Sequence, residues 1–424
     1  MDIVSLYKVY RDYPSVQTDT RKLQTGDIYF ALKGPNFNGN AFAEKALSQG
    51  AAYAVIDEEK YKTDARMILT EDVLTTLQQL AHHHRQQLNI PFLSVTGSNG
   101  KTTTKELVRA VLSTAYSTYA TEGNLNNHIG IPLTLLRIKS DVEIAVIEMG
   151  ANHQKEIEGY CKIVNPTHGI ITNVGKAHLE GFGGIEGVKK GKGELFDYLR
   201  TYGGTAFVCR DFDYFHEMTH DIHEVVWYGT SDNGYVHGKV DAHDPFLSME
   251  TNYTGILNTQ MVGSYNQYNV LAAVTIGKYF NINAASVKKA IEAYIPSNSR
   301  SQFIQRHNNA FILDAYNANP TSMQAAIENF ADSKNYDKKV LMLGGMMELG
   351  IESLEEHQKL VDLIGKYPWH EVVLVGGDFS KIKHPYLYLP DSHAAKAWFE
   401  SRNFHDMTIL VKGSRAIAME KVIQ

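Results

Sequence analysis

The stretch VTGSNGKTTTKELVRAVL, from Val95 to Leu112, constrains this chain more than any other part of its sequence. An apolar, strand-like run leads into Gly97, and a helix-like run starts near Thr102. Glycines let backbone N–H groups turn towards an anion at the start of a helix. This order of strand, glycine loop and helix therefore predicts a phosphate-binding loop.

Each residue type in this loop has a chemical reason to be there. Lys101 would reach the β- and γ-phosphates of a nucleotide, and the Thr102 hydroxyl would complete the oxygen shell of Mg²⁺. The loop is shorter than the usual GxxxxGK[ST] form, because Val95 stands six residues before Lys101. The alternative, a tight turn with a surface lysine, does not explain this combination of residues. We predict that the following residues bind the phosphates of a nucleotide: Gly97, Ser98, Asn99, Gly100, Lys101, Thr102 and Thr103.

Strands alternate with helices along most of the chain. Near-continuous apolar runs such as FLSVTG, EIAVIEMG and THGIITNVG predict a parallel sheet that is covered by helices on both faces. The Pro-, Ser- and Asn-containing run YIPSNSR reads as a linker, after which the alternation restarts. We therefore predict an α/β protein of three domains: a small N-terminal α/β domain (1–82), a central P-loop parallel-sheet ATPase domain (83–296) and a C-terminal Rossmann-like domain with a smaller parallel sheet (297–424).

A predicted helix, EDVLTTLQQLAHHHRQQLN, leads from the first domain into the second and contains three consecutive histidines. Consecutive helical residues point in different directions, so His82, His83 and His84 cannot easily share one metal ion. We expect them to lie on a solvated face.

Composition excludes several classes of protein. The 41 Lys and Arg residues against 47 Asp and Glu give a net charge of −6, so the chain has no global basic field for nucleic acid. The N-terminal residues do not resemble a signal peptide, and no window reaches the roughly 18 apolar residues that a membrane span needs. Only Cys161 and Cys209 occur, which favours a reducing compartment. We expect a soluble cytoplasmic protein.

Three further stretches carry a resemblance to a known family. They are GNLNNHIGIPLTLL (123–136), the segment 147–188 that contains AHLEGFG, and ILVKGSRAIAMEKVI (409–423). Together with the phosphate loop they resemble the Mur ligase family, ATP-dependent enzymes that join amino acids or a dipeptide to the UDP-muramoyl precursor of peptidoglycan. The resemblance spans essentially the whole chain. AHLEGFG and NLNNHIG are most similar to the branch that adds D-alanyl-D-alanine.

The resemblance implies catalytic residues beside Lys101. Glu148 ends a predicted strand, where parallel sheets bind ligands, and matches a family glutamate that binds Mg²⁺ next to Thr102. His178 matches a histidine that binds a second magnesium, although by itself it reads as an ordinary loop or core histidine. Lys192 matches a lysine that reacts with CO₂ to form a metal-binding carbamate, although Gly191 replaces the family's alanine before it. A lysine cluster like this one is otherwise typical of a solvated face.

The resemblance also implies a set of nucleotide contacts. Asn266 and Asn269 lie three residues apart at a helix start, thus on one face, and match a stretch that meets adenine. A histidine is common in the family where Tyr265 stands here, and the alternative role for Asn266 is a helix cap. Asp314 matches a ribose contact and Arg300 a phosphate contact. Gly345 stands where relatives usually carry aspartate, so we carry no function to that position.

Polar loops supply the expected substrate contacts, and two of them also have a structural alternative. Asn319 followed by Pro320 is a good helix start without any ligand, and Asp19 to Arg21 form a turn common at domain surfaces. The resemblance implies a UDP site in the first domain, and the Asn-rich turn of the last domain would face the phosphates and the dipeptide. The predicted substrate-binding residues are Asp19, Thr20, Arg21, Asn124, Asn126, Asn127, His128, Asn317 and Asn319.

The expected reaction follows from this branch of the family. With ATP and Mg²⁺, the enzyme would phosphorylate the terminal carboxylate of UDP-N-acetylmuramoyl-tripeptide, and the amine of D-alanyl-D-alanine would attack the acyl phosphate. We expect a monomer that acts in cell-wall synthesis. The alternatives are a sister Mur ligase or folate-type ligase that adds one amino acid, or a regulatory protein that hydrolyses ATP without forming an amide.

Overall fold

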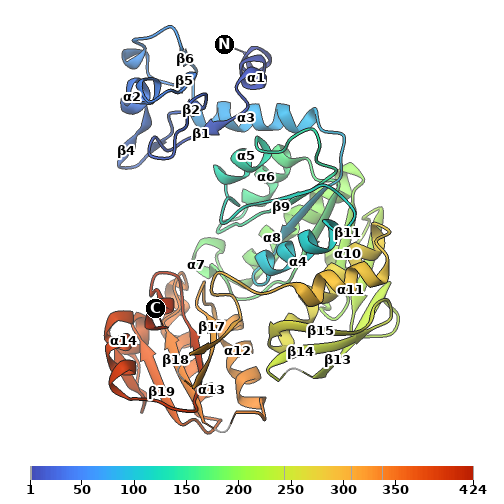
Figure 1. The fold of residues 1–424 in the computed structure, drawn as a ribbon, viewed down its shortest axis with the longest axis vertical. Helices are drawn as coiled ribbons and strands as arrows, with labels where there is room; N and C mark the ends of the chain where they lie inside the picture. The colour runs from blue at the N-terminus through green and yellow to red at the C-terminus, as the bar shows by residue number, and fades with distance from the viewer. Residues whose placement is uncertain (1, 243, 307, 337, 424) are drawn as a thin grey trace.

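Three α/β domains follow one another along the longest axis of the molecule (Figure 1). The computed structural model describes residues 2–242, 244–306, 308–336 and 338–423. Each domain has its own sheet, and the central domain separates the other two (Figure 1). The predicted three-domain α/β architecture is confirmed.

The N-terminal domain is built on a small parallel sheet of strand order β1-β2-β5-β6. Buried apolar side chains on its strands, such as Ile28 and Phe30, pack against the helices α1 and α3. Its elements are α1 (Ile3–Asp12), β1 (Val16–Gln17), β2 (Ile28–Phe30), β3 (Lys33–Gly34), β4 (Phe37–Asn38), η1 (Gly39–Phe42), α2 (Ala43–Ser48), β5 (Tyr53–Ile56), η2 (Glu59–Tyr61), β6 (Met67–Leu69) and α3 (Val73–Gln86).

Helix α3 joins the first two domains, and it corrects one prediction. His84 is buried: one ring nitrogen lies 3.1 Å from the Tyr7 hydroxyl and the other 2.9 Å from the carbonyl of Ile138. The expectation of a solvated face is therefore wrong for His84. The physical reason is that His84 comes four residues after Leu80 and seven after Leu77, so it lies on the buried face of α3, which packs against α1 and against helices of the central domain.

The central sheet has nine strands in the order β15-β14-β13-β12-β11-β10-β7-β9-β8. The strands from β8 to β13 run parallel, as predicted. The first part of the domain contains β7 (Phe92–Thr96), α4 (Lys101–Leu112), β8 (Thr118–Ala120), α5 (Gly130–Leu135), β9 (Ile144–Glu148), α6 (Glu156–Val164), β10 (His168–Ile171), α7 (Leu179–Phe182), α8 (Ile185–Tyr202) and β11 (Thr205–Cys209).

The second part of the central domain departs from an all-parallel sheet. Strands β14 and β15 are antiparallel to their neighbours, an extension that the sequence reading missed. Their exposed and buried residues alternate, as in an antiparallel sheet with one face in solvent. This part contains α9 (Tyr214–Met218), β12 (Glu224–Gly229), β13 (Val236–Ala242), β14 (Phe246–Thr251), β15 (Gly255–Val262), η3 (Ser264–Asn266), α10 (Gln267–Tyr279) and α11 (Ala284–Ala293).

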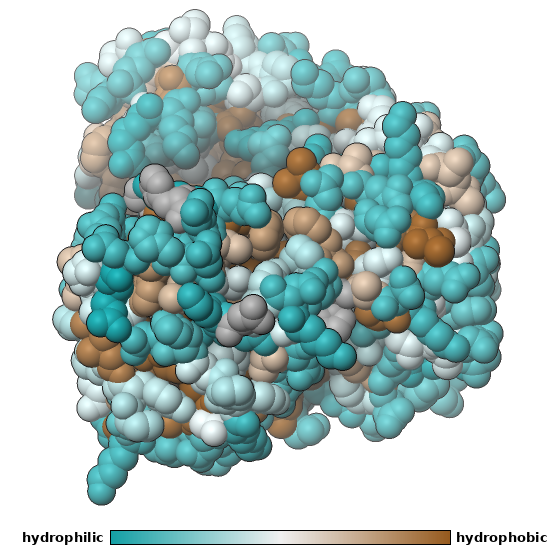
Figure 2. Space-filling view, turned by 60° about the horizontal axis from the view of Figure 1, so that its bottom comes forward, coloured by the Kyte–Doolittle hydropathy of each residue, from teal (hydrophilic) through white to brown (hydrophobic). Residues whose placement is uncertain are grey.

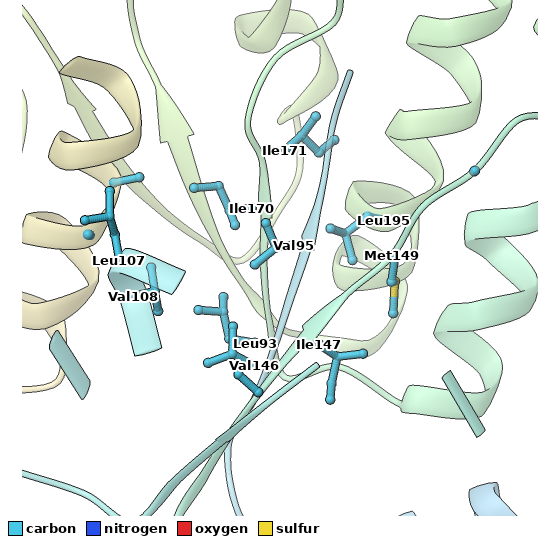
Figure 3. Close-up of a cluster of buried hydrophobic side chains, with 14 of the residues drawn as sticks. Leu93, Val95, Leu107, Val108, Val146, Ile147, Met149, Ile170, Ile171 and Leu195 are labelled. Carbon is cyan, nitrogen blue, oxygen red and sulfur yellow. The ribbon is translucent and has the colours of Figure 1, made fainter. Parts of the chain in front are cut away.

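A dry core lies directly behind the phosphate loop. Figure 3 shows Leu107 and Val108 of α4 on one side of the central strands and Leu195 of α8 on the other, with Val95 of β7 between them. All four side chains are fully buried. Burial of each of these side chains stabilises the fold by about 1.5–3 kcal/mol. The strand ends that carry the loop are therefore held by a closely packed core.

The C-terminal sheet has the strand order β16-β17-β21-β18-β19-β20. It is parallel, as predicted, except for the edge strand β16, which pairs antiparallel with β17 as a hairpin after the linker. The elements are β16 (Gln302–Arg306), β17 (Asn309–Asp314), α12 (Pro320–Asp332), β18 (Lys339–Gly344), η4 (Gly350–Glu352), α13 (Ser353–Ile364), β19 (Glu371–Val375), η5 (Gly377–Lys381), β20 (Leu387–Leu389), α14 (Ser392–Ser401), β21 (Thr408–Lys412) and η6 (Met419–Ile423).

The C-terminal domain is docked on the central domain through several polar contacts. The Lys176 ammonium donates to the buried carboxylate of Glu356 at 2.6 Å, and Lys176 N donates to the Thr321 hydroxyl at 3.0 Å. Asn329 accepts hydrogen bonds from the backbone and hydroxyl of Ser264. These contacts bring the ends of two parallel sheets to face each other.

The surface is mainly polar. On the face in Figure 2, hydrophilic residues predominate and hydrophobic ones occur in small, scattered groups. Among the helices that the structure describes, none combines the length and the apolar character needed to cross a membrane.

Candidate active site

A cavity of about 710 Å³ opens between the central and C-terminal domains. Most of the residues predicted for ATP, metal and dipeptide binding line it. The predicted residues on its wall are Ser98, Asn99, Gly100, Lys101, Thr102, Thr103, Asn126, Asn127, His128, Glu148, His178, Asn266, Asn269, Arg300, Asp314, Asn317 and Asn319. Residues far apart in the sequence thus form one site.

The phosphate loop connects β7 to α4 in a conformation that needs glycine. Gly100 immediately precedes α4 with φ 79°, and Gly97 has φ 140°. A Cβ atom at Gly97 would lie 2.0 Å from the Thr172 hydroxyl oxygen, so no other residue fits there. Asn173, which the sequence analysis did not select, accepts a hydrogen bond from Asn99 N at 3.0 Å and braces the loop.

Lys101 is held inside its own loop. Its ammonium donates to the carbonyls of Gly97 at 2.7 Å and Ser98 at 3.3 Å. Burial lowers the pKa of Lys101 below its ordinary value, while the carboxylate of Glu148 acts in the opposite direction. A desolvated cation at a helix start is suited to phosphate oxygens.

Glu148 forms the acidic centre of the site. It ends β9 and is only 2% exposed. One carboxylate oxygen accepts from the Thr102 hydroxyl at 2.8 Å, and the other accepts from the Asn126 amide at 2.8 Å. A carboxylate and a hydroxyl fit the way proteins bind Mg²⁺, in which substrate phosphates supply most of the other oxygens. In the described part of the chain, no cluster of three or more His, Cys, Asp or Glu residues could hold a metal by itself.

A second buried cation, Lys105, lies behind this carboxylate and was not foreseen. Its ammonium donates to the Thr121 carbonyl at 2.6 Å and pairs with Glu106 at 2.8 Å. It lies 4.0 Å from Glu148, whose backbone N–H donates to the Thr121 hydroxyl. The lysine-to-carbonyl bond therefore fixes the chain segment that positions Glu148.

His178 lies just before α7 in a left-handed backbone conformation, with φ 53°. Its Nδ1 atom pairs with the carboxylate of Glu348, which belongs to the C-terminal domain. The close contact with His178 lowers the pKa of Glu348 below its ordinary value. The sequence could not reveal this partner, because the two residues come from different domains.

Lys192 is buried in α8, with 1% of its surface exposed. Its ammonium donates to the Ala151 carbonyl at 3.0 Å and lies 4.8 Å from the centre of the Phe182 ring. Burial holds the pKa of Lys192 well below its ordinary value, and the nearby charge of Lys101 lowers it further. A neutral amine is the form that reacts with CO₂, so this environment suits the carbamate. Gly191 packs against the same ring, where a Cβ would lie 2.5 Å from Phe182 Cε1.

Two asparagines form the end of the cavity at α10. Asn269 donates to Asn266 at 2.8 Å and accepts from the Thr104 hydroxyl at 3.0 Å. Asn266 donates to the Val262 carbonyl and does not cap the helix with its side chain. The aromatic rings of Phe212, Tyr214 and Tyr268, which the sequence analysis did not select, line the same end of the cavity.

The C-terminal domain contributes the opposite wall. Asp314 at the end of β17 pairs with the buried Lys412 at 2.5 Å and accepts from Ser301 N at 3.1 Å. The guanidinium of Arg300 lies 3.6 Å from the centre of the Tyr316 ring. Lys412 and Tyr316 were not selected from the sequence, although Lys412 also ends a parallel strand and the sheet rule could have found it.

The Asn-rich turn, Asn317 to Asn319, caps a helix and also reaches the phosphate loop. Asn319 caps α12 by accepting from Ser322 N at 2.9 Å, and Pro320 follows at the first helical position. Its amide also donates to Asn99 of the phosphate loop at 2.7 Å. Asn317 lines the cavity, and its side chain accepts from Ala318 N. The turn therefore links the two domains at the phosphate site.

The loop between Gly123 and Gly130 lies only partly in the cavity. Asn126 contacts Glu148 there, while Asn127 accepts from the backbone of Ile129 and Gly130 at the start of α5. His128 lines this cavity and a second one of about 720 Å³ between α3 and α6. Asn124 is exposed and lies outside the walls of both.

The predicted UDP-binding turn lies apart from these cavities, in the N-terminal domain. Asp19 and Arg21 form an exposed ion pair at 2.8 Å, and Arg21 lowers the pKa of Asp19 to about 2 by hydrogen bonding. Neither these residues nor Thr20 lines the two cavities. Their role in binding UDP stays a prediction.

Close backbone packing explains the glycine at the position where relatives usually carry aspartate. A Cβ atom at Gly345 would lie 2.6 Å from the Cα of Gly377. The neighbouring hydroxyl of Ser414 is buried and has no hydrogen-bond partner among the described residues. An aspartate could not fit here without a shift of the backbone at Gly377.

Comparison with known families decides where the chain belongs. The model of the Mur ligase middle domain matches residues 95–277, that of the Mur ligase glutamate ligase domain matches residues 299–415, and that of the Mur ligase family catalytic domain matches residues 12–93. The chain is a member of the Mur ligase family. This confirms the resemblance drawn from the phosphate loop and the AHLEGFG stretch.

Relatives within the Mur ligase family match over nearly the whole chain. The UDP-N-acetylmuramoyl-tripeptide–D-alanyl-D-alanine ligase of Bacillus subtilis is 34% identical, over 96% of this chain and 92% of that protein. Its counterpart in Escherichia coli is also 34% identical, over 97% and 93%. The MurF crystal structure from Acinetobacter baumannii has a TM-score of 0.87 at 30% identity, over 96% and 92% of the two chains. The Thermotoga maritima MurF ligase in complex with ADP has a TM-score of 0.86 at 25% identity, over 96% of each chain.

Proposed function

We propose that this chain is the ATP-dependent ligase that adds D-alanyl-D-alanine to UDP-N-acetylmuramoyl-tripeptide during peptidoglycan synthesis. One observation carries the proposal: a phosphate loop, a buried carboxylate with a hydroxyl partner, and the polar ends of a second sheet all face one cavity. The full-length relatives named for this activity support the same reaction.

Residues of the central domain act on the phosphates of ATP. Backbone N–H groups at the start of α4 and the ammonium of Lys101 hold the phosphates of ATP and stabilise charge as the γ-phosphoryl group leaves ADP. The terminal carboxylate of the tripeptide takes this group and becomes an acyl phosphate. The amine of D-alanyl-D-alanine then attacks the acyl carbon, and phosphate leaves from the tetrahedral intermediate.

Thr102 and Glu148 are the residues that we assign to Mg²⁺, with His178 and a carbamylated Lys192 for a second ion. When bound, the ion would neutralise charge on the phosphate oxygens. Asn126 keeps Glu148 in place through its 2.8 Å hydrogen bond. The docked C-terminal domain keeps water away from the acyl phosphate, which would otherwise hydrolyse.

The remaining assignments belong to the same proposal. We assign the purine to Asn266 and Asn269, the ribose to Asp314 and a phosphate to Arg300. The acceptor and the dipeptide contact the loop 124–128 and the turn 317–319, and the UDP group binds the turn 19–21. We also propose domain boundaries after residues 82 and 296, a monomer, and a cytoplasmic location.

The test is a measurement of phosphate release. The protein is incubated with ATP, Mg²⁺ and UDP-N-acetylmuramoyl-tripeptide, with and without D-alanyl-D-alanine. We expect phosphate release to depend on the dipeptide and to match the amount of UDP-muramoyl-pentapeptide that mass spectrometry detects. Release that ignores the dipeptide and gives no pentapeptide would contradict the proposal and favour a regulatory ATPase.

A further inference from the structure

The ring of His178 is held by a residue of another domain. Its Nδ1 atom is buried and forms an ion-pair contact with the carboxylate of Glu348, without a hydrogen bond to any described residue, while His178 lines the central cavity. This leaves Nε2 as the ring nitrogen available to a ligand in the cavity. The backbone of His178 is fixed as well, since α7 follows directly and its Phe182 N–H bonds to the His178 carbonyl at 3.1 Å.

Glu348 stands on a loop whose position is set inside the C-terminal domain. Met346 N donates to Nε2 of the fully buried His357 at 3.1 Å, and Nδ1 of His357 donates to the Ser353 carbonyl at 2.7 Å. Ser353 in turn donates to Asp378 at 2.6 Å. The loop that carries Glu348 is therefore braced by its own domain, independently of His178.

The same loop touches α7 a second time. Glu180 N donates to the Glu348 carbonyl at 3.4 Å, and Gly350 packs against the side chain of Glu180. In Figure 1, α7 lies on the side of the central domain that faces the C-terminal domain. The contact between Glu348 and His178 is thus part of the docked interface between the two domains.

We propose that Glu348 is a positioning residue that orients the His178 imidazole for magnesium, so that this metal position is complete only when the C-terminal domain is docked. The inference rests on the proposed function, because it assumes that His178 binds the second ion. A histidine that binds a metal generally donates its other N–H to a carboxylate, which fixes the tautomer and the direction of the ring. Here that carboxylate comes from a different domain.

Docking has other supports, which allows the role of Glu348 to be tested separately. Lys176 with Glu356, and Asn319 with Asn99, hold the two domains together without Glu348. Removal of the Glu348 carboxylate should therefore leave the domains docked while it frees the His178 ring.

The experiment compares Glu348→Ala and the closer mimic Glu348→Gln with a matched control, Glu355→Gln. Glu355 is an exposed glutamate of α13 that pairs only with Lys359 among the ion pairs of the described chain. Calorimetry measures Mn²⁺ binding to the full chain with a non-hydrolysable ATP analogue. Nitrogen NMR of the metal-free protein reports the tautomer of His178, whose signals are assigned by their loss in His178→Ala.

We expect Glu348→Ala to weaken one of two Mn²⁺ binding steps by about 10 to 100-fold and to leave the other unchanged. Glu348→Gln, which keeps an acceptor but loses the charge, should fall between Glu348→Ala and the wild type. The His178 signals should change from a single Nδ1–H tautomer to a mixture in Glu348→Ala. The control should match the wild type in both measurements.

Two outcomes overturn the inference, and they differ in what they say about the proposed function. If the wild type binds two ions and forms product, but both Glu348 variants bind Mn²⁺ as the wild type does, only the positioning role fails. If the wild type binds no Mn²⁺ beside the nucleotide analogue, the magnesium-dependent reaction fails with it. A misfolded Glu348→Ala, recognised by circular dichroism, leaves the decision to Glu348→Gln.

Discussion

Replacement of Asn319 by alanine should weaken two contacts at once. The side chain caps α12 through Ser322 N at 2.9 Å and donates to Asn99 of the phosphate loop at 2.7 Å. Loss of an asparagine cap costs about 1 kcal/mol, and loss of a neutral hydrogen bond costs roughly another 1 kcal/mol. The expected destabilisation is therefore about 2 kcal/mol at the junction between the two domains.

Hydrogen exchange measured by mass spectrometry gives this energy locally. If α12 exchanges by local opening, about 2 kcal/mol corresponds to about 30-fold faster exchange of its first turn. Asn319→Ser keeps a capping oxygen but has no amide to reach Asn99, so it should show only about 1 kcal/mol, or roughly a fivefold increase.

The control for the cap alone is Asp391→Ala. Asp391 caps α14 by accepting from His393 N and Ala394 N, away from the phosphate loop. This variant should speed exchange in α14 and leave ATP affinity unchanged, whereas Asn319→Ser should weaken ATP binding. Wild-type exchange in Asn319→Ser would show that the contact with Asn99 contributes nothing, and equal rates in Asn319→Ala and Asn319→Ser would show the same of the cap; either result would refute the reasoning.

Three further changes test other parts of the site and core. Burial lowers the pKa of His168 to about 4, so between about pH 6.5 and pH 4 the unfolded chain binds a proton there that the folded chain does not. The urea midpoint should therefore fall as the pH drops through this range, and His168→Phe should lack this part of the fall. The same pH profile in His168→Phe as in the wild type would contradict this reasoning. Lys101→Ala should reduce turnover by at least about 100-fold with an unaltered circular dichroism spectrum, and retained activity would remove Lys101 from the reaction. Gly97→Ala should abolish ATP binding in calorimetry, because the added Cβ would lie 2.0 Å from the Thr172 hydroxyl; wild-type affinity would show that the loop can shift.

The sequence predicts those features that depend on local patterns. The phosphate loop is contained in six consecutive residues from Gly97 to Thr102, and Glu148 follows from the rule that ligands gather at the carboxyl ends of parallel strands. The cap at Asn319 and Pro320 likewise depends on neighbouring residues. These features could be read without knowledge of the tertiary structure.

The features that were missed depend on partners distant in the sequence. The partners of His84 are Tyr7 and Ile138, which are distant in the sequence, although its spacing from Leu77 and Leu80 already places it on the buried face of α3. Glu348 acquires its role only through His178, which lies on another element of the fold. The antiparallel strands β14 and β15 were missed because short alternating strands give a weaker signal than long apolar runs.

Asn269 joins the two ends of the nucleotide cavity. The same amide oxygen that accepts from Thr104 also lies against the phosphate loop, where a Cβ at Gly100 would be 2.5 Å away. A base that displaces this amide would therefore push on Gly100, the residue immediately before α4. We therefore expect GTP to differ from ATP in the rate of phosphoryl transfer as well as in affinity. The reason is that a shift of the phosphate loop would move the triphosphate of GTP out of line with the carboxylate that attacks it.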